Sequence, residues 1–136
     1  MKELKVEAAV KNIEVVTDFV NAELERLNCP PKVRTQISIA IDEMFGNIAR
    51  YAYTPNVGNA AVCFEVQENP LSVIITFIDN GKPFNPLEQT HIDTTAPVEK
   101  RGIGGLGIFL VKETMDMVEY EYKEGQNILT IKKNLV

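Results

Sequence analysis

The sequence has few of the residues that build metal centres and few that bind nucleic acid. It contains two cysteines, Cys29 and Cys63, and one histidine, His91. The cysteines match no metal-binding spacing, and we expect free thiols in a reducing compartment. Lysine and arginine together number 14 against 19 acidic residues, a net charge of −5. Proteins that bind nucleic-acid backbones carry clustered basic residues, so we expect no direct nucleic-acid binding. The net negative charge suits a partner with a basic surface.

Long apolar runs are also missing from the chain. No stretch approaches the length of a membrane-spanning helix. Residues 1–11 carry charges at nearly every other position, where a signal peptide would be apolar. We therefore expect a cytoplasmic protein without a membrane segment. A length of 136 residues suits one domain, which we expect to cover residues 1–136.

Hydrophobic periodicity predicts the order β-α-α-β-β-loop-α-β-β. Apolar residues at helical spacing predict one helix from Ile13 to about Asn28, capped by Asn12, and a second from Val33 to about Tyr53. Alternation predicts strands around residues 4–8, 61–66, 72–78, 118–122 and 128–131. Because the strands come in hairpins, we expect an α+β two-layer sandwich, with three helices on one face of a mixed, largely antiparallel sheet.

The expected core positions of the helices follow from the same spacing. Alternatives remain where two neighbouring residues fit the stripe equally well. The first helix offers Ile13, Val16, Phe19 or Val20, Leu24 and Leu27; the second offers Val33, Ile37, Ile41, Met44, Ile48 and Tyr51 or Ala52; the third offers Ile108, Val111 and Met115.

A glycine-rich stretch, Arg101–Gly107, opens the third helix. Backbone N–H groups beside a helix N-terminus bind phosphate. The G-x-G-x-x-G spelling does not indicate a dinucleotide fold, because the polar segment Asp93–Lys100 contains Pro97 and cannot be the strand which that motif requires. No Walker A motif occurs. The alternative is a flexible loop without a ligand.

One polar face of the second helix lies beside its apolar stripe. At 100° per residue, Glu43, Asn47 and Arg50 lie within about 60° of one another. A positioned Glu can accept a proton from a hydroxyl, and an Asn oxygen can bind Mg²⁺. The alternative is a solvated face with a surface ion pair between Glu43 and Arg50.

Asp79-Asn80-Gly81 follows the predicted strand 72–78. An Asp at this position can accept a hydrogen bond from a purine amino group, and Gly81 lets a flat ring approach the backbone. The alternative is an ordinary turn at the end of a strand, which these residues form readily.

Three motifs taken in order resemble those of the GHKL superfamily of ATPases: Glu43-x-x-x-Asn47, Asp79-x-Gly81 and the glycine-rich stretch. This superfamily includes gyrase, heat-shock chaperones, sensor histidine kinases and mismatch-repair ATPases. The segments 78–86 and 104–111 are most similar to the anti-sigma-factor serine/threonine kinases of that superfamily. The resemblance covers nearly the whole chain and implies a Bergerat-type ATP-binding fold.

The resemblance also implies roles for individual residues. Glu43 matches the general base, Asn47 the Mg²⁺ ligand, and Asp79, with Gly81 beside it, the adenine-recognising carboxylate. Arg101 is placed to touch the terminal phosphate of ATP, and Phe84–Arg101 matches a mobile lid. The phosphate-binding glycines correspond to Gly102, Gly104, Gly105 and Gly107.

Two positions depart from the pattern of the family. Tyr51 stands where relatives often carry His. Gly125-Gln126-Asn127 stands where relatives often carry a Gly-Thr pair whose Thr supports the adenine-binding Asp. The adenine contact is therefore expected to use water or another side chain.

The function implied by the resemblance is a protein serine/threonine kinase that uses ATP and Mg²⁺. It would phosphorylate an anti-anti-sigma protein and sequester a sigma factor, as a homodimer. An ATP-gated binding module that transfers no phosphate is the alternative. A histidine-kinase core is disfavoured, because His91 lies in the expected lid and no dimerising helix with a phospho-accepting His precedes the domain.

Overall fold

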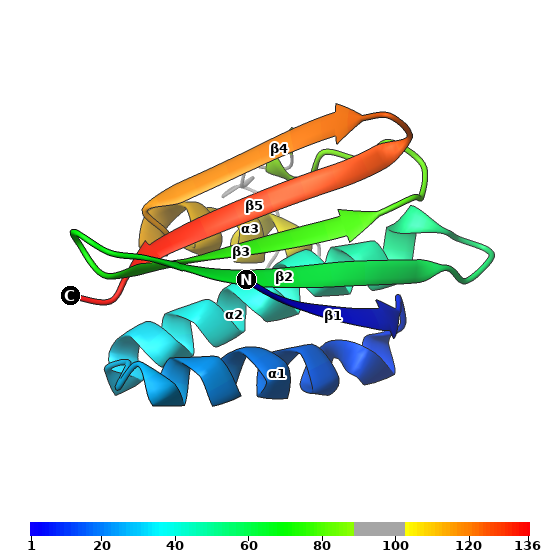
Figure 1. The fold of residues 1–136 in the computed structure, drawn as a ribbon. Coiled ribbons are helices and arrows are strands. Elements are labelled where there is room, and N and C mark those ends of the chain that lie inside the picture. Colours follow the sequence, from blue (N-terminus) through cyan, green and yellow to red (C-terminus); the bar gives the residue numbers. More distant parts are fainter. Residues whose placement is uncertain (89–102) are drawn as a thin grey trace.

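Strands and helices form two layers. The computed structural model describes residues 1–88 and 103–136. Its strands form one five-stranded sheet in the order β1-β2-β3-β5-β4, and the helices lie together on one side of that sheet (Figure 1). Every strand pairing in the described residues is antiparallel. The predicted α+β sandwich is confirmed, and its sheet is antiparallel throughout the described part.

The elements follow the predicted order. Both predicted hairpins are present, and the second closes through Glu124 and Gly125, which have positive φ values of 53° and 78°, as a two-residue primed turn requires. No helix within residues 1–88 and 103–136 is both long enough and apolar enough to cross a membrane. The elements are β1 (Lys2–Glu7), α1 (Ile13–Arg26), α2 (Pro31–Asn47), β2 (Asn59–Gln67), β3 (Ser72–Asp79), α3 (Ile103–Thr114), β4 (Met117–Lys123) and β5 (Gln126–Asn134).

The predicted capping of α1 by Asn12 is wrong. Asn12 ends a 3₁₀ turn, Val10–Asn12, and its side chain makes no capping hydrogen bond. Its Nδ2 instead donates to the carbonyl oxygen of Glu7 at 2.8 Å. A capping side chain needs an extended backbone to turn back onto the first helical N–H groups. The 3₁₀ turn gives Asn12 a φ of −92° and a ψ of 1°, which removes that conformation.

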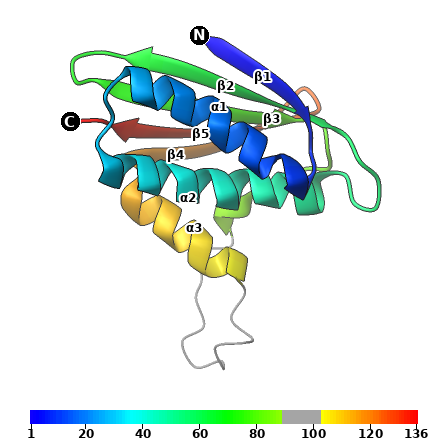
Figure 2. The same ribbon diagram turned by 90° about the horizontal axis from the view of Figure 1, so that it is seen from below.

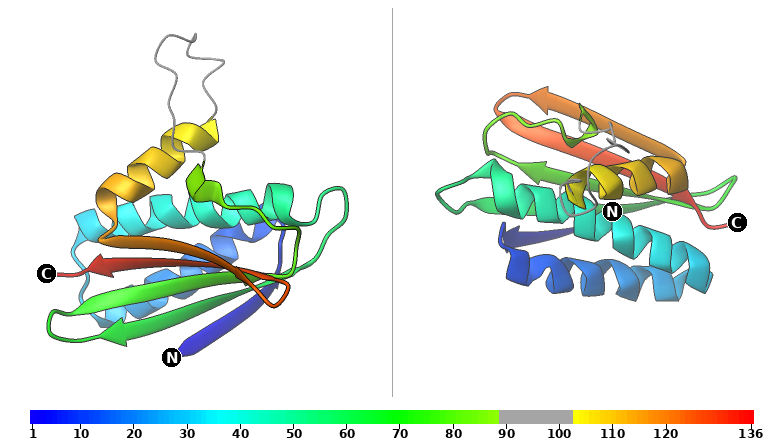
Figure 3. Two further views of the ribbon diagram at one scale, coloured as in Figure 1. Left: turned by 90° about the horizontal axis from the view of Figure 1, so that it is seen from above. Right: turned by 180° about the vertical axis from the view of Figure 1, so that it is seen from behind.

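The core lies between the sheet and the three helices, with α2 in the middle of the helical layer between α1 and α3 (Figures 2 and 3). In α1 the stripe uses Val20, which is fully buried, in preference to Phe19. At the end of the second helical stretch Ala52 is buried and Tyr51 is 45% exposed. The stripe predicted for the third helix is confirmed, because Ile108 and Val111 of α3 and Met115, directly after its end, are buried.

A π-helical turn, Ile48–Ala52, continues α2 to the predicted end near Tyr53. Such turns are rare and often occur at functional sites. The carbonyl oxygen of Ala52 accepts a hydrogen bond from the Lys82 N–H at 3.0 Å. A Cβ atom on Gly81 would lie 2.2 Å from the same oxygen, so only glycine allows this contact. The end of this helical stretch is thereby held against the turn that follows β3.

Candidate functional site

Glu43 and Asn47 lie one turn apart on α2. Asn47 is 4% exposed and Glu43 is half-buried. The Asn47 Nδ2 donates to Glu43 Oε1 over a long 3.5 Å. Because the amide nitrogen faces Glu43, the Asn47 oxygen is the atom left for a ligand, and it has no hydrogen-bond partner among the described residues. This oxygen is of the type that Mg²⁺ prefers.

The surroundings of Glu43 favour a carboxyl that takes up protons readily. Burial raises the pKa of Glu43, while the hydrogen bond from Asn47 and the positive charge of Arg50 lower it and the nearby Asp42 raises it. Arg50 and Glu43 form no ion pair in the described residues, so the predicted alternative of a surface ion pair is absent there. A raised pKa brings a glutamate closer to the range in which a general base works well.

The first turns of α3 pack directly on Glu43. A Cβ atom on Gly107 would lie 2.0 Å from Glu43 Oε2 and 2.4 Å from its Cδ. The missing side chain therefore lets the backbone of α3 reach the carboxylate. Because α3 begins at Ile103, Gly104, Gly105 and Gly107 form its first turns instead of a loop before it. Arg101 and Gly102 lie outside the described residues.

Asp79 is the last residue of β3 and is 3% exposed. Its Oδ1 accepts hydrogen bonds from the Gly81 N–H and from Asn127 Nδ2, each at 2.9 Å. Burial raises the pKa of Asp79, and these two hydrogen bonds oppose the rise. Asp79 does form a turn with Gly81, as the simpler interpretation predicts. Burying a charged carboxylate is costly, and an ordinary surface turn does not need one. The burial of Asp79 therefore favours a binding role over a simple turn.

Asn47 and Asp79 line the same cavity, between α2 and the ends of β3 and β5. Its volume is about 20 Å³, enough for one or two water molecules. Phe84 and Pro86 form part of its wall. The remaining lining combines one carboxylate and two carboxamides with mostly apolar side chains: Met44, Ile48, Ala52, Phe77, Tyr120 and Leu129 line it with Asn47, Asp79 and Asn127.

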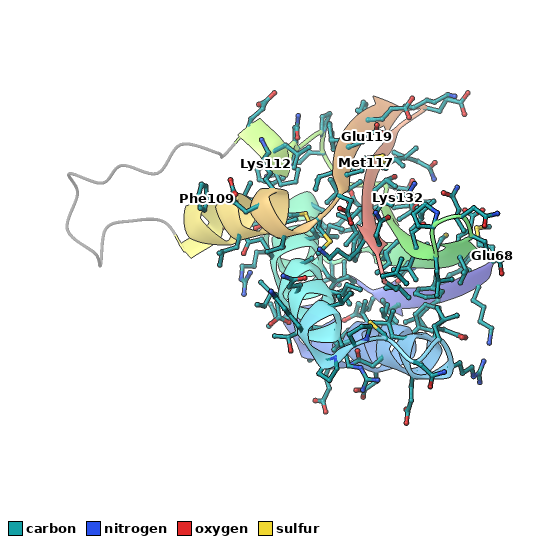
Figure 4. All side chains as sticks on the ribbon, turned by 90° about the vertical axis from the view of Figure 1, so that its left-hand side faces the viewer. Glu68, Phe109, Lys112, Met117, Glu119 and Lys132 are labelled. Atoms are coloured by element: carbon teal, nitrogen blue, oxygen red, sulfur yellow. The ribbon has the colours of Figure 1, made fainter. Side chains whose placement is uncertain are left out.

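Residues 84–88 form a short strap beside this cavity. The ring of Phe84 packs on that of Tyr51, with centroids 5.6 Å apart. Lys112, which points outward from α3 in Figure 4, donates from Nζ to the Leu87 carbonyl oxygen at 3.4 Å. These contacts tie the strap to the helical layer. The predicted lid, Phe84–Arg101, extends from this strap into residues outside the described part.

Sequence reasoning missed two side chains that organise the site. Tyr53 accepts a hydrogen bond from the Asn80 N–H at 2.8 Å and donates to the Asn59 carbonyl oxygen at 2.6 Å, which fixes the turn after Asp79. Asn127 donates to Asp79 itself. The sequence signal for Asn127 was its place in Gly125-Gln126-Asn127, where relatives often carry the supporting Thr. Its partner could not be named, because that depends on how β5 pairs with β3.

Comparison with known proteins finds a matching family and several similar proteins. The family model described as a histidine kinase-like ATPase domain matches residues 6–133. A serine-protein kinase RsbW from Bacillus thuringiensis (strain Al Hakam) is 29% identical over 134 residues, which cover 96% of this chain and 82% of that protein. A serine-protein kinase RsbW from Bacillus anthracis is also 29% identical over 134 residues, with the same coverage of both chains.

Two solved structures share the fold. The RsbU and RsbW domains of Rv1364c from Mycobacterium tuberculosis superpose with a TM-score of 0.66 at 14% identity, over 99% of this chain. This chain spans only 33% of that longer protein. The histidine kinase domain of the blue-light activated histidine kinase from Erythrobacter litoralis EL346 gives a TM-score of 0.52 at 14% identity, over 78% of this chain and 46% of that one.

Proposed function

The chain belongs to the histidine kinase-like ATPase domain family, and from that premise we propose that it is an ATP-dependent protein serine/threonine kinase and an anti-sigma factor. It phosphorylates an anti-anti-sigma protein on a serine or threonine, and the phosphorylation weakens that complex. The freed kinase then sequesters a sigma factor. We further propose that it acts as a cytoplasmic homodimer and contacts neither nucleic acid nor membrane.

The observation that carries this proposal is the convergence of Asn47 and Asp79 on one cavity. They come from α2 and from the end of β3, more than thirty residues apart in the chain. Glu43 lies one turn from Asn47 and in contact with α3. The residues that the family resemblance assigns to adenine, metal and proton transfer thus lie at one end of the two layers.

The cavity suits the base and metal of Mg²⁺–ATP in its chemistry. Asp79 would accept a hydrogen bond from the amino group of adenine, with Gly81 beside it, and the apolar walls would take the ring faces. The Asn47 oxygen would hold Mg²⁺, which supplies charge neutralisation at the phosphates. Because the cavity is only about 20 Å³, the strap with Phe84 and Pro86 must move outward to admit a purine.

The other residues would act on the phosphates and the acceptor hydroxyl. Glu43 accepts the proton of the substrate hydroxyl as it attacks. The N-terminus of α3 presents its N–H groups and positive dipole end to the phosphates. Arg101 is assigned to the terminal phosphate. The glycines assigned to the same contact are Gly102, Gly104, Gly105 and Gly107.

Phosphotransfer can be tested with γ-³²P-labelled ATP, Mg²⁺ and a purified anti-anti-sigma protein encoded in the same genome. We expect label on the acceptor protein. Glu43→Gln should lower the transfer rate roughly 10²–10⁴-fold, the usual contribution of a general base, with the affinity for ATP nearly unchanged. Asp42→Asn is the matched control, because it removes a neighbouring exposed carboxylate of the same helix.

Transfer at the normal rate by Glu43→Gln contradicts the assigned role of Glu43. If the unmodified chain binds ATP and its partner but transfers no label, the ATP-gated binding module is the correct function. The homodimer is tested separately by sedimentation, where a chain of 15.2 kDa should sediment at twice its monomer mass.

A further inference from the structure

Asn127 and Asp79 are direct cross-strand partners on β5 and β3. Both side chains point into the helix-covered face of the sheet, and they are 5% and 3% exposed. Residues that lie opposite each other in an antiparallel pair have side chains close enough to interact. The register of the two strands therefore places a carboxamide beside the buried carboxylate.

The carboxamide of Asn127 uses its full hydrogen-bonding capacity. Its Nδ2 donates to Asp79 Oδ1 and to the Lys82 carbonyl oxygen, each at 2.9 Å. Its Oδ1 accepts from the Phe84 N–H at 3.1 Å and from the Tyr120 hydroxyl. A carboxamide has two donor hydrogens and an oxygen with two lone pairs, so these four bonds saturate it. A fifth, longer contact joins Nδ2 to the Gly81 carbonyl oxygen at 3.5 Å and shares a hydrogen with one of them.

Three of these bonds fix the orientation of the carboxamide. A flipped amide would set its NH₂ against the Phe84 N–H, which can only donate, and its oxygen against two acceptors. The Tyr120 hydroxyl can donate or accept, so it does not choose between the two orientations, but its hydrogen bond to Oδ1 holds the carboxamide in place. Asn127 therefore always presents a donor to Asp79.

This donor acts on one oxygen of the carboxylate. Asp79 Oδ1 accepts two hydrogen bonds, from Asn127 and from the Gly81 N–H. Asp79 Oδ2 has no hydrogen-bond partner in the described part of the chain. The two hydrogen bonds on Oδ1 favour the ionised form of Asp79 and restrict rotation of its carboxylate. They leave Oδ2 as the oxygen that can accept from a ligand in the cavity that Asp79 lines.

We propose that Asn127, held in place by Tyr120, is the positioning residue that makes Asp79 select purines with an exocyclic amino group at the 6-position. The inference rests on the proposed binding of ATP. Asn127 lies in the stretch that stands where relatives often carry the supporting Thr, and it offers a carboxamide donor in place of a hydroxyl. Asn127 acts through Asp79 and is assigned no contact with the nucleotide.

The test compares ATP with purine riboside triphosphate, which lacks only the 6-amino group. The unmodified chain should bind ATP roughly 10–100-fold more tightly, the range for a hydrogen bond to a charged group. In Asn127→Leu this ratio should fall to about threefold or less, because Asp79 loses its fixed orientation. Tyr120→Phe, which removes one hydroxyl, should give an intermediate ratio.

Tyr122→Phe is the matched control, because it removes the same hydroxyl two residues from Tyr120 on β4, at the position opposite Asn127. Tyr122 is 45% exposed and makes no hydrogen bond to Asn127 in the described residues. Its ratio should equal that of the unmodified chain. If Asn127→Leu does not fold, the test compares the nucleotide ratio of Tyr120→Phe with that of Tyr122→Phe.

The ratio separates positioning from a merely structural role. A structural defect weakens both nucleotides by the same factor and leaves the ratio unchanged, and that result overturns the inference. Equal binding of both nucleotides by the unmodified chain also overturns it, while ATP binding itself stands. If the unmodified chain binds neither nucleotide, the proposed function fails as well.

Discussion

At the scale of single residues, Asp79 carries a conflict between stability and binding. Its carboxylate is almost fully buried, and burial raises its pKa. An ionised group in such a position lowers the free energy of unfolding relative to a neutral one of the same shape. We infer that the cost is tolerated because an ionised acceptor is what a purine amino group requires.

Asp79→Asn tests this conflict. The Asn oxygen can keep both internal hydrogen bonds now made by Oδ1, while its NH₂ replaces Oδ2 and turns an acceptor into a donor. We expect ATP binding to fall at least roughly tenfold while the protein stays folded. Asp18→Asn, a change at an exposed carboxylate of α1, should leave binding unaltered.

The stability of Asp79→Asn should also depend on pH in a defined direction. The folded-state pKa of Asp79 is raised, so the native state binds its proton more tightly than the unfolded state. The free energy of unfolding contributed by Asp79 therefore falls as pH rises from its unfolded pKa through its folded pKa. Urea titrations should show the variant gaining stability relative to the unmodified chain across that window. A difference that is constant with pH contradicts this account.

At the scale of elements, the packing of α3 on α2 decides where Glu43 stands. The backbone at Gly107 occupies the space that a side chain would need beside the carboxylate. Periodicity predicts both helices and their buried faces, and it does so from local spacing alone. It does not predict which residue of α3 meets Glu43, because that depends on how the two helices cross and slide on each other.

Gly107→Ala should therefore act on catalysis more than on folding. The added methyl group displaces the Glu43 carboxylate, and we expect the phosphotransfer rate to fall roughly tenfold or more, toward that of Glu43→Gln. The loss of stability should stay within about 1–3 kcal/mol, as for other overpacked positions. Gly46→Ala is the control, since its methyl group would meet only the end of the Arg50 side chain, at 2.7 Å from Nη1. Equal transfer rates in the two variants contradict the role of this contact.

At the scale of the whole molecule, the candidate site depends on both layers at once. Glu43 and Asn47 belong to the helical layer, and Asp79 and Asn127 belong to the sheet. A ligand held between them binds the folded state and not the unfolded chain. It must therefore stabilise the protein by mass action.

Mg²⁺–ATP at a hundredfold excess over its Kd should raise the free energy of unfolding by about 2.7 kcal/mol. For a domain of this size the midpoint of thermal unfolding should rise by roughly 5–15 °C, as differential scanning fluorimetry would measure. Asp79→Asn should show little of this rise at the same nucleotide concentration. An unmodified chain whose midpoint does not move with Mg²⁺–ATP contradicts the nucleotide site.

The sequence by itself determined the order of the elements, both hairpins, most buried stripes and the resemblance to the ATPase family, because these depend on residues close together in the chain. Only the tertiary structure decided that Asn127 supports Asp79, that Gly107 lies on Glu43 and that Val20 and Ala52 face the core. Asn12 shows the same limit locally, since a 3₁₀ turn redirected a side chain that suits a cap. Strand register and helix packing bring together residues whose spacing in the sequence carries no signal of contact, so these pairings emerge only when the strands pair and the helices pack on the sheet.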